Sequence, residues 1–354
     1  MSYDLCEELI IEIFSRLPSK SLLRFRSVSK SLCACIDSPD FIGLHTLRSP
    51  KRVLMIHQFP YEREEHLKNI YTLHAQGQFP NNPYTEIPQI KFPFSFKIIG
   101  SCNGIICICG NGDLHLWNPS VRRIVTIHDL SSWCRRYYEC ISAGVLGFGF
   151  DPIINDYKIL RITTPTSYIY SMKTRTWRVI ASPVTPLITF VKLDQCLFDG
   201  ALHWVVKRYL TDARDECDYF IMKFGLSLEV FSTIELPEPS WETSVVTIIK
   251  GCLGVISSDN RDRSWIWVRR EDNNTDSWCV AYKLDTNPFK GASRVFQITP
   301  NDELLYNVHC NGIRVYNLGT KGLSTLVASS EPSTSLVDMD VCVENLGLLD
   351  KGNT

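Results

Sequence analysis

The spacing of apolar residues along the chain changes near residue 50. Before that point, apolar side chains recur every three or four residues, which predicts amphipathic helices. After it, short β-branched and aromatic runs alternate with turn residues, a pattern typical of β-strands. The sequence therefore predicts a mainly β protein with a small α-helical N-terminal module, residues 1–48, followed by one β domain, residues 49–354.

Three helices are expected in the N-terminal module. Pro18 ends the first helix, Ser19 can cap a second helix that runs to Ile36, and Ser38 before Pro39 is typical of a third helix start. Three short helices bury little apolar surface among themselves. We therefore expect the module to lean on a partner.

One pattern recurs in the β region. An aromatic residue ends one strand, a short polar turn follows, and a bulky apolar residue opens the next strand. The pairs are Trp117 with Ile124, Tyr170 with Trp177, Phe224 with Phe231, Trp267 with Trp278, and Tyr316 with Leu323. Their first members lie about 50 residues apart, the length of a four-stranded propeller blade. The pattern favours a β-propeller-like domain of about six blades, and another all-β sandwich or barrel is the alternative.

Four dipeptides indicate where hairpins turn. They are Asn103-Gly104, Asn111-Gly112, Asp199-Gly200 and Asn311-Gly312. Asn, Asp and Gly tolerate the positive φ angles that two-residue hairpin turns require. Each dipeptide lies near β-branched or aromatic runs, so we expect each to connect two antiparallel strands.

Composition and charge exclude several classes of protein. The formal net charge of −1 gives no general attraction to nucleic acid. The most apolar stretch, residues 98–109, is shorter than the roughly 20 residues that a membrane span needs. The 14 cysteines form no Cys-x-x-Cys motif, so we interpret them as reduced thiols. We expect a cytoplasmic and/or nuclear protein with no metal, no cofactor, and neither nucleic acid nor membrane as a partner.

The motifs of common enzymes are missing from the sequence. It contains no Gly-x-Ser-x-Gly, no His-Glu-x-x-His, no Gly-x-x-x-x-Gly-Lys, and no Gly-x-Gly-x-x-Gly after a strand. His203, beside Trp204 in a predicted strand, is interpreted as a packed residue. We therefore assign no catalytic residue and expect a protein that is not an enzyme.

Two parts of the chain resemble a known family. Leu-Ile-Ile-Glu-Ile-Phe-Ser-Arg-Leu-Pro at 9–18 and Ser-Leu-Leu-Arg-Phe-Arg-Ser-Val-Ser-Lys at 21–30 closely resemble an F-box. Gly-Phe-Gly-Phe-Asp at 147–151, Asp-Tyr-Lys at 156–158 and Asp-Gly-Ala-Leu-His-Trp at 199–204 resemble the kelch-like F-box-associated domain of plant F-box proteins. The resemblance implies the substrate-recognition subunit of an SCF-type cullin–RING ubiquitin ligase.

The resemblance also implies partners. The F-box would dock on a Skp-type adaptor, and through it on the cullin and RING subunits, while the C-terminal domain would hold a protein substrate for ubiquitination. The expected adaptor-binding residues are Leu5, Leu9, Ile10, Ile13, Leu17, Pro18, Leu22, Leu23, Arg24, Arg26, Val28, Lys30 and Leu32.

The F-box departs from the family pattern at two positions. Cys6 follows Leu5 where the family has Leu-Pro, and Leu32 stands where the family has Trp. Both changes could weaken adaptor binding. The alternative function is therefore a propeller that acts as a protein-interaction scaffold or inhibitor without ligase assembly.

A second cluster of residues is typical of a protein interface. Trp, Tyr and Arg are enriched at interface hot spots, and the sequence gathers five such residues between two predicted strands. They are Trp133, Arg135, Arg136, Tyr137 and Tyr138. We expect this segment to contact the substrate, with an ordinary packed loop as the alternative.

Overall fold

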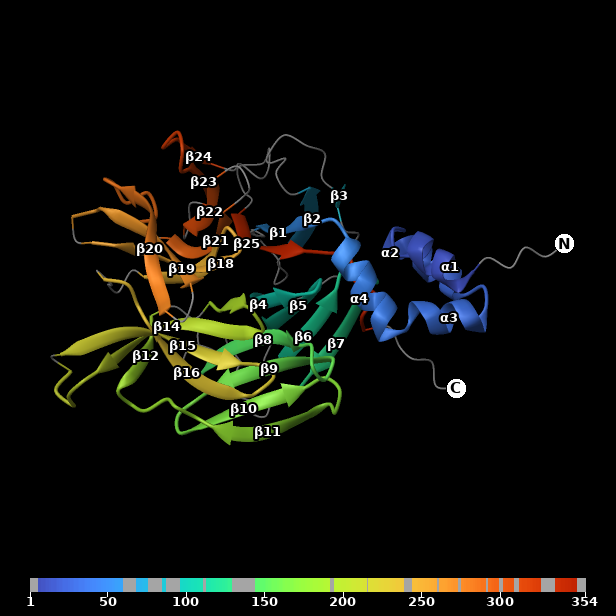
Figure 1. Ribbon diagram of the computed structural model, residues 1–354, viewed down its shortest axis with the longest axis horizontal. Coiled ribbons are helices and arrows are strands. Elements are labelled where there is room, and N and C mark those ends of the chain that lie inside the picture. Colours follow the sequence, from blue (N-terminus) through green and yellow to red (C-terminus); the bar gives the residue numbers. More distant parts are fainter. Residues whose placement is uncertain are drawn as a thin grey trace.

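Helices occupy the N-terminal part of the computed structural model, and strands occupy the rest (Figure 1). The structure describes residues 6–59, 68–75, 85–86, 96–110, 113–128, 144–191, 194–214, 216–238, 244–259, 261–272, 275–290, 292–298, 302–308, 312–325 and 335–348. The predicted fold class, a mainly β protein with a small helical module, is confirmed.

The described N-terminal module has four helices rather than three. They are α1 (Glu7–Phe14), α2 (Ser19–Arg26), α3 (Lys30–Ile36) and α4 (Pro39–Arg48). The prediction of one helix from Ser19 to Ile36 was wrong, because two serines interrupt it. The Ser27 hydroxyl donates to the carbonyl oxygen of Arg24 at 2.7 Å, and the Ser29 hydroxyl accepts from the Leu32 N–H at 3.1 Å. Ser29 thereby caps a new helix.

Six antiparallel sheets follow within the described residues, and each is one blade of a propeller. Blade 1 contains β1 (Arg52–Phe59), β2 (Lys68–Ala75), β3 (Thr85–Glu86) and β25 (Ser335–Cys342). Blade 2 contains β4 (Phe96–Cys102), β5 (Ile105–Gly110), β6 (Asp113–Asn118) and β7 (Arg123–Ile127). Blade 3 contains β8 (Val145–Asp151), β9 (Asp156–Ile162), β10 (Thr166–Ser171) and β11 (Thr176–Ala181).

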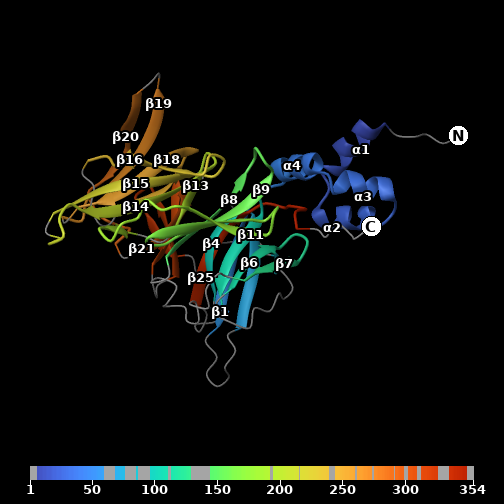
Figure 2. The same cartoon turned by 90° about the horizontal axis from the view of Figure 1, so that it is seen from below.

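The other three blades follow in chain order. Blade 4 contains β12 (Ile188–Phe190), β13 (Cys196–Phe198), β14 (Ala201–Tyr209), β15 (Cys217–Gly225) and β16 (Val230–Glu235). Blade 5 contains β17 (Val245–Ile249), β18 (Cys252–Ser258), β19 (Ser264–Asp272) and β20 (Thr275–Leu284). Blade 6 contains β21 (Ala292–Ile298), β22 (Glu303–Val308), β23 (Gly312–Asn317) and β24 (Leu323–Thr325). The hairpin of β19 and β20 projects from the ring (Figure 2).

β25 closes the ring. It follows blade 6 in sequence but pairs antiparallel with β1, the first strand of the domain. It also contacts β4 of blade 2 and β23 of blade 6, while the other neighbours meet through β4 and β8, β8 and β14, β14 and β17, and β17 and β21. The expectation of about six blades is therefore confirmed, and the ring is held closed by noncovalent strand pairing.

Four of the five predicted hairpin pairs are opposite one another. Trp117 faces Ile124, Tyr170 faces Trp177, Phe224 faces Phe231 and Tyr316 faces Leu323. The fifth pairing was wrong. A bulge between Ile266 and Trp267 shifts the register, so Trp267 faces Val280 and Trp278 faces Arg269.

Two predicted Asn-Gly and Asp-Gly turns are confirmed by their backbone angles. Asn103 and Gly104 have φ of 50° and 77°, and Asp199 and Gly200 have φ of 45° and 64°. The other two dipeptides lie wholly or partly outside the described residues. Lys250 with Gly251 makes a similar turn, with φ of 50° and 79°, which the sequence did not predict because Lys is not a typical turn residue.

From blade 2 to blade 6, apolar side chains fill the spaces between neighbouring blades. Phe148 is fully buried between blades 2 and 3, Trp204 between blades 3 and 4, and Tyr306 between blades 5 and 6. β5 is buried along its whole length, and most of β14 is buried as well. Because these two strands are covered on both faces of their sheets, they carry apolar runs rather than strict alternation.

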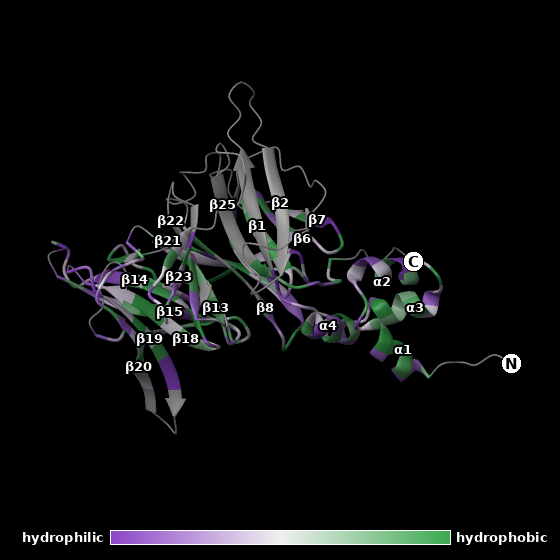
Figure 3. Cartoon of the chain, turned by 90° about the horizontal axis from the view of Figure 1, so that it is seen from above, coloured by the Kyte–Doolittle hydropathy of each residue, from purple (hydrophilic) through white to green (hydrophobic). Residues whose placement is uncertain are grey.

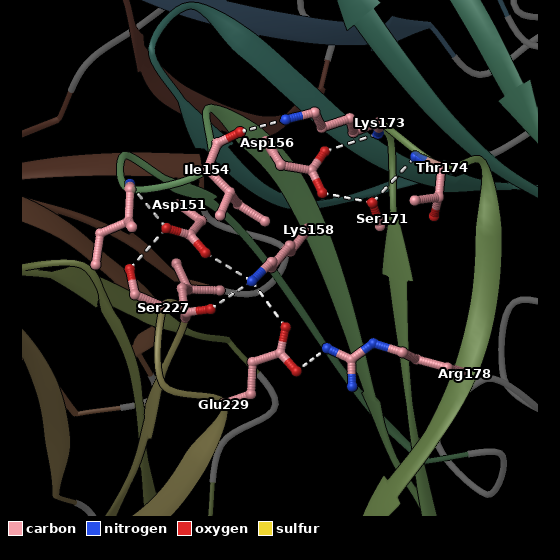
Figure 4. A network of polar contacts seen from close by, with 12 residues as sticks. Asp151, Ile154, Asp156, Lys158, Ser171, Lys173, Thr174, Arg178, Ser227 and Glu229 are labelled. Atoms are coloured by element: carbon pink, nitrogen blue, oxygen red, sulfur yellow. Dashed lines mark hydrogen bonds and ion pairs between the residues drawn. The ribbon is translucent and has the colours of Figure 1, made fainter.

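A polar cluster joins blade 3 to blade 4 (Figure 4). The Lys158 ammonium on β9 lies 2.7 Å from Asp151 Oδ2, 2.8 Å from Glu229 Oε1 and 2.8 Å from the carbonyl oxygen of Leu226. The Ser227 hydroxyl donates to Asp151 Oδ1 at 2.7 Å. These contacts tie the β8–β9 hairpin of one blade to the β15–β16 turn of the next.

Burial sets the energetics of this cluster. The side chain of Lys158 is only 3% exposed and that of Asp151 only 1%. Burial acts to raise the pKa of the Asp151 carboxyl, but hydrogen bonds from Lys158, Ser227 and the Ile153 N–H outweigh it and hold the pKa below its usual value. Lys158 and Asp151 are therefore a charged pair that needs both of its members.

We predict that Lys158→Met lowers the free energy of unfolding by about 3 kcal/mol, because it leaves the buried Asp151 carboxylate without its cation, whereas Glu229 keeps its ion pair with Arg178. Urea unfolding followed by tryptophan fluorescence measures the change. Lys283→Met on β20 is the control: that side chain is exposed, so its loss changes stability by about 0.5 kcal/mol or less. Equal stability of the two variants would contradict the prediction.

Candidate functional site

The helices share their core with the propeller. Leu22, Ile36 and Phe41 are buried together with Leu346, which comes from the segment that follows β25. Val121 of the β6–β7 turn also packs against this cluster. The partner on which the small module leans is therefore, in part, the propeller of the same chain.

Five large apolar side chains of the described helical module are exposed, Phe25 on α2 and Leu47 on α4 among them. Leu9 and Ile13 lie one turn apart on α1 and are 53% and 51% exposed, and Val28, in the turn after α2, is 69% exposed. Much of α1 is coloured as apolar in Figure 3. Soluble proteins rarely expose contiguous apolar surface without a partner for it. Leu9, Ile13 and Val28 are also among the predicted adaptor-binding residues, and we take these three side chains as the candidate docking surface.

The basic residues of the module divide into two groups. Lys20, Arg24 and Lys30 are exposed. Arg26 instead donates to both carboxylate oxygens of Asp37 at 2.6 and 2.7 Å, and this hydrogen bonding raises the pKa of Arg26. Arg26 thus links α2 to the end of α3, and Arg16 and Arg48 pair with Glu12, whereas Lys20, Arg24 and Lys30 are placed to meet a partner.

The thirteen residues expected to bind the adaptor differ in burial. Leu22 is fully buried in the shared core, and Leu5 lies outside the described residues. The exposed residues are Leu9, Ile13, Pro18, Arg24, Val28 and Lys30, and the partly buried ones are Ile10, Leu17, Leu23, Arg26 and Leu32. The apolar stripe that the sequence shows is therefore divided between a core and a surface.

The residues that attach the helices to the propeller were not predicted from the sequence. Ser19 at the start of α2 donates through its backbone N–H and its hydroxyl to Glu344 Oε2, at 2.7 and 2.9 Å. Asn345 Nδ2 donates to Thr46 Oγ1 of α4 at 3.0 Å. No local pattern marks Glu344, Asn345 or Leu346, because their partners lie some 300 residues earlier in the chain.

The second predicted site lies outside the described residues. It comprises five residues between β7 and β8: Trp133, Arg135, Arg136, Tyr137 and Tyr138. Their contact with a substrate stays a prediction.

The described residues contain no cluster of three or more metal-ligating side chains. No helix among them is long and apolar enough to cross a membrane. The described cysteines are free thiols, and burial raises the pKa of Cys196 to about 12, which keeps it protonated.

His203 is a packed residue, as the sequence suggested. It is buried on β14, with Nδ1 at 3.3 Å from the carbonyl oxygen of Cys196. Burial lowers the pKa of His203 to about 4, so the ring is neutral at pH 7. It is therefore part of the fold of blade 4.

Two family profiles match the chain. The profile described as F-box domain matches residues 3–42, and the one described as F-box associated beta propeller domain matches residues 57–317, more than half of the chain. The chain belongs to the F-box-associated β-propeller family. The helical module is its F-box, and the resemblance to plant F-box proteins of this kind is confirmed.

Relatives of this F-box protein occur in Arabidopsis thaliana. F-box protein CPR1 is 23% identical over 386 residues, which are 96% of this chain and 88% of that protein. F-box protein At3g16210 is 27% identical over 248 residues, 67% of this chain and only 62% of that protein. Among solved structures, TolB from Acinetobacter baumannii covers 86% of this chain and 70% of its own, with 10% identity and a TM-score of 0.47, too distant to inform function.

We predict that His203 makes the propeller less stable in acid. Between its folded pKa of about 4 and its ordinary pKa of about 6.5, the unfolded chain binds a proton that the folded chain does not. Stability is therefore lost as the pH falls from 6.5 to 4, by about 3 kcal/mol from this residue. His203→Gln, which cannot titrate, should show a flatter dependence when unfolding is measured at pH 6.5, 5 and 4. The same dependence in both proteins would refute this role.

Proposed function

We propose that this F-box protein is the substrate-recognition subunit of an SCF-type cullin–RING ubiquitin ligase. Its F-box docks on the Skp-type adaptor, which brings the cullin and RING subunits, and its propeller holds a protein for ubiquitination. The exposure of Leu9, Ile13 and Val28 carries the proposal. The propeller already covers the other apolar side of the module, so these three side chains are left for a separate partner.

Burial of apolar surface supplies the affinity of such an interface. Each apolar side chain that becomes fully buried contributes roughly 1.5 to 3 kcal/mol, and part of this offsets the entropy lost on association. The exposed Lys20, Arg24 and Lys30 attract an acidic partner and orient it during the encounter. An acidic adaptor with an apolar groove fits both features.

The protein itself forms and breaks no covalent bond in this role. It raises the effective concentration of a substrate lysine near a ubiquitin-loaded conjugating enzyme, so its contribution is proximity and orientation. This function needs no cofactor, and the protein acts in the cytoplasm, the nucleus or both.

Ile13→Asp and Val28→Asp should each weaken binding of the purified Skp-type adaptor by at least about tenfold, since each buries a carboxylate in an apolar interface. Both positions are exposed, so the propeller should unfold at the same temperature as in the unmodified protein. Isothermal titration calorimetry with the full chain measures the affinity.

Leu47→Asp is the matched control. Leu47 is an 86% exposed apolar residue of the same module, on α4, and its variant should bind the adaptor normally. Normal binding by the Ile13 and Val28 variants would contradict the proposed surface. No binding by the unmodified chain, with a standard F-box protein as positive control, would favour the scaffold alternative.

The second predicted surface has its own test. If Trp133, Tyr137 and Tyr138 contact the substrate, their triple alanine variant should lose the substrate and keep the adaptor, because aromatic side chains dominate interface energies. Proximity labelling under proteasome inhibition identifies the substrate by comparing the unmodified chain with an F-box-deleted chain. Unchanged capture of that substrate by the triple variant would place the binding surface elsewhere.

A further inference from the structure

Five residues after β25 connect the propeller to the F-box, and we call residues 343–347 the latch. Three consecutive latch residues reach three different parts of the F-box. Glu344 accepts hydrogen bonds at the start of α2, Asn345 donates to α4, and Leu346 enters the core between the helices. The latch is therefore part of the folded F-box, although it lies about 300 residues away in sequence.

Glu344 supplies a cap that α2 lacks. The residue before α2 is Pro18, which offers no side-chain acceptor, and the first turn of α2 contains no acidic residue. The Glu344 carboxylate accepts the Ser19 N–H at 2.7 Å, satisfying one of the amide groups left free at a helix start. Its negative charge also lies at the positive end of the helix dipole. α2 depends on this distant residue because its own sequence provides no substitute.

Leu346 supplies a core residue that the helices lack. It is fully buried beside Leu22, Ile36 and Phe41, which come from α2, α3 and α4. Removing such a side chain leaves a cavity among three helices that have few other contacts to compensate. The buried side of the F-box is therefore incomplete without the latch.

The propeller holds the latch in place. Asn118 Nδ2, at the end of β6, donates to the carbonyl oxygens of Asn345 and Gly347 at 3.0 and 2.8 Å. The Val343 carbonyl oxygen would lie 2.2 Å from a Cβ at Gly104, so the backbone of the β4–β5 turn approaches too closely for any other residue. The latch also directly follows β25, the strand that closes the ring. Its position is thus set by the closed propeller.

We propose that the latch makes the adaptor-binding F-box conditional on closure of the propeller. The F-box is synthesised first, but its helix cap and one of its core residues arrive about 300 residues later, when β25 has paired with β1. Until then α2 and α4 lack contacts that the folded F-box requires. A chain whose propeller is open therefore binds the adaptor poorly and is kept out of the ligase. The adaptor part of this inference rests on the proposed function.

The coupling works in both directions. If ring closure favours adaptor binding, adaptor binding must favour ring closure by the same free energy. Adaptor bound to the F-box should therefore protect the amides of β25 and the latch from hydrogen exchange.

The test uses the full chain with single substitutions. In Leu346→Asp, hydrogen exchange in α2 and α4 should accelerate by at least about tenfold and the adaptor should bind at least about tenfold more weakly. Exchange in β14 and β15, on the other side of the ring, should not change. Leu323→Asp is the matched control, because Leu323 is an exposed leucine of blade 6, and it should leave both measurements unchanged.

A milder pair of variants distinguishes loss of the latch contacts from general unfolding. Leu346→Ala removes only apolar contacts, and it should accelerate exchange in α2 and α4 by at least about fivefold while Leu323→Ala does not. Unchanged exchange in these helices, or normal adaptor affinity in both Leu346 variants, would overturn the latch. Failure of the adaptor to protect β25 would overturn the reciprocal coupling.

The exchange measurements separate this inference from the proposed function. If the unmodified chain does not bind the adaptor, the proposed function fails, and exchange in α2 and α4 still decides whether the latch completes the F-box. If the unmodified chain binds and the Leu346 variants bind equally well, the latch fails and the proposed function stands.

Discussion

The pairing of β25 with β1 is the interaction on which the rest of the structure depends. It supplies the strand of blade 1 that contacts both β4 of blade 2 and β23 of blade 6, and it joins the end of the chain to the first strand of the domain. The entropic cost of closing so long a loop rises only slowly with its length, so one well-paired strand can offset it. The same strand leads directly into residues 343–347, which contact the helices, so one end of the chain takes part in both ring closure and F-box packing.

A second constraint acts between blades 3 and 4. The Lys158 cluster takes charges out of water, a cost that apolar packing would avoid. The cluster contributes directional contacts. The Lys158 ammonium is held by Asp151, Glu229 and the Leu226 carbonyl oxygen, and these contacts fix the register in which the two blades meet. Apolar contacts elsewhere between the blades are less directional. A ring that must close at its last strand tolerates little accumulated error in register.

Much of the fold could be predicted because its signals are local. An aromatic residue and its partner seven positions later belong to one hairpin, so Trp117 with Ile124 and Tyr170 with Trp177 could be paired from sequence. Trp267 could not, since a bulge adds a residue that spacing does not reveal. The break between α2 and α3 was missed because apolar spacing continued through Ser27 and Ser29, whose hydroxyls end one helix and begin the next.

The candidate site was only partly predictable, for the same reason. Helical spacing shows that Leu9, Ile13 and Leu22 are apolar positions of amphipathic helices, but it does not show which of them another part of the chain covers. Leu346 covers Leu22 and leaves Leu9 and Ile13 exposed. The contacts of Glu344, Asn345 and Leu346 join segments about 300 residues apart, and a single sequence carries no local trace of such contacts.

The attachment of the F-box at two places bears on how the receptor works. α4 ends at Arg48 and β1 begins at Arg52, so a short connection and the latch both join the helices to the ring. A single flexible linker would let the propeller sample many orientations, which lowers the effective concentration of a bound substrate at any one point. Two connections narrow the range of orientations that the propeller can take relative to the F-box. The proposed receptor contributes proximity and orientation rather than bond chemistry, so this restriction would favour its function.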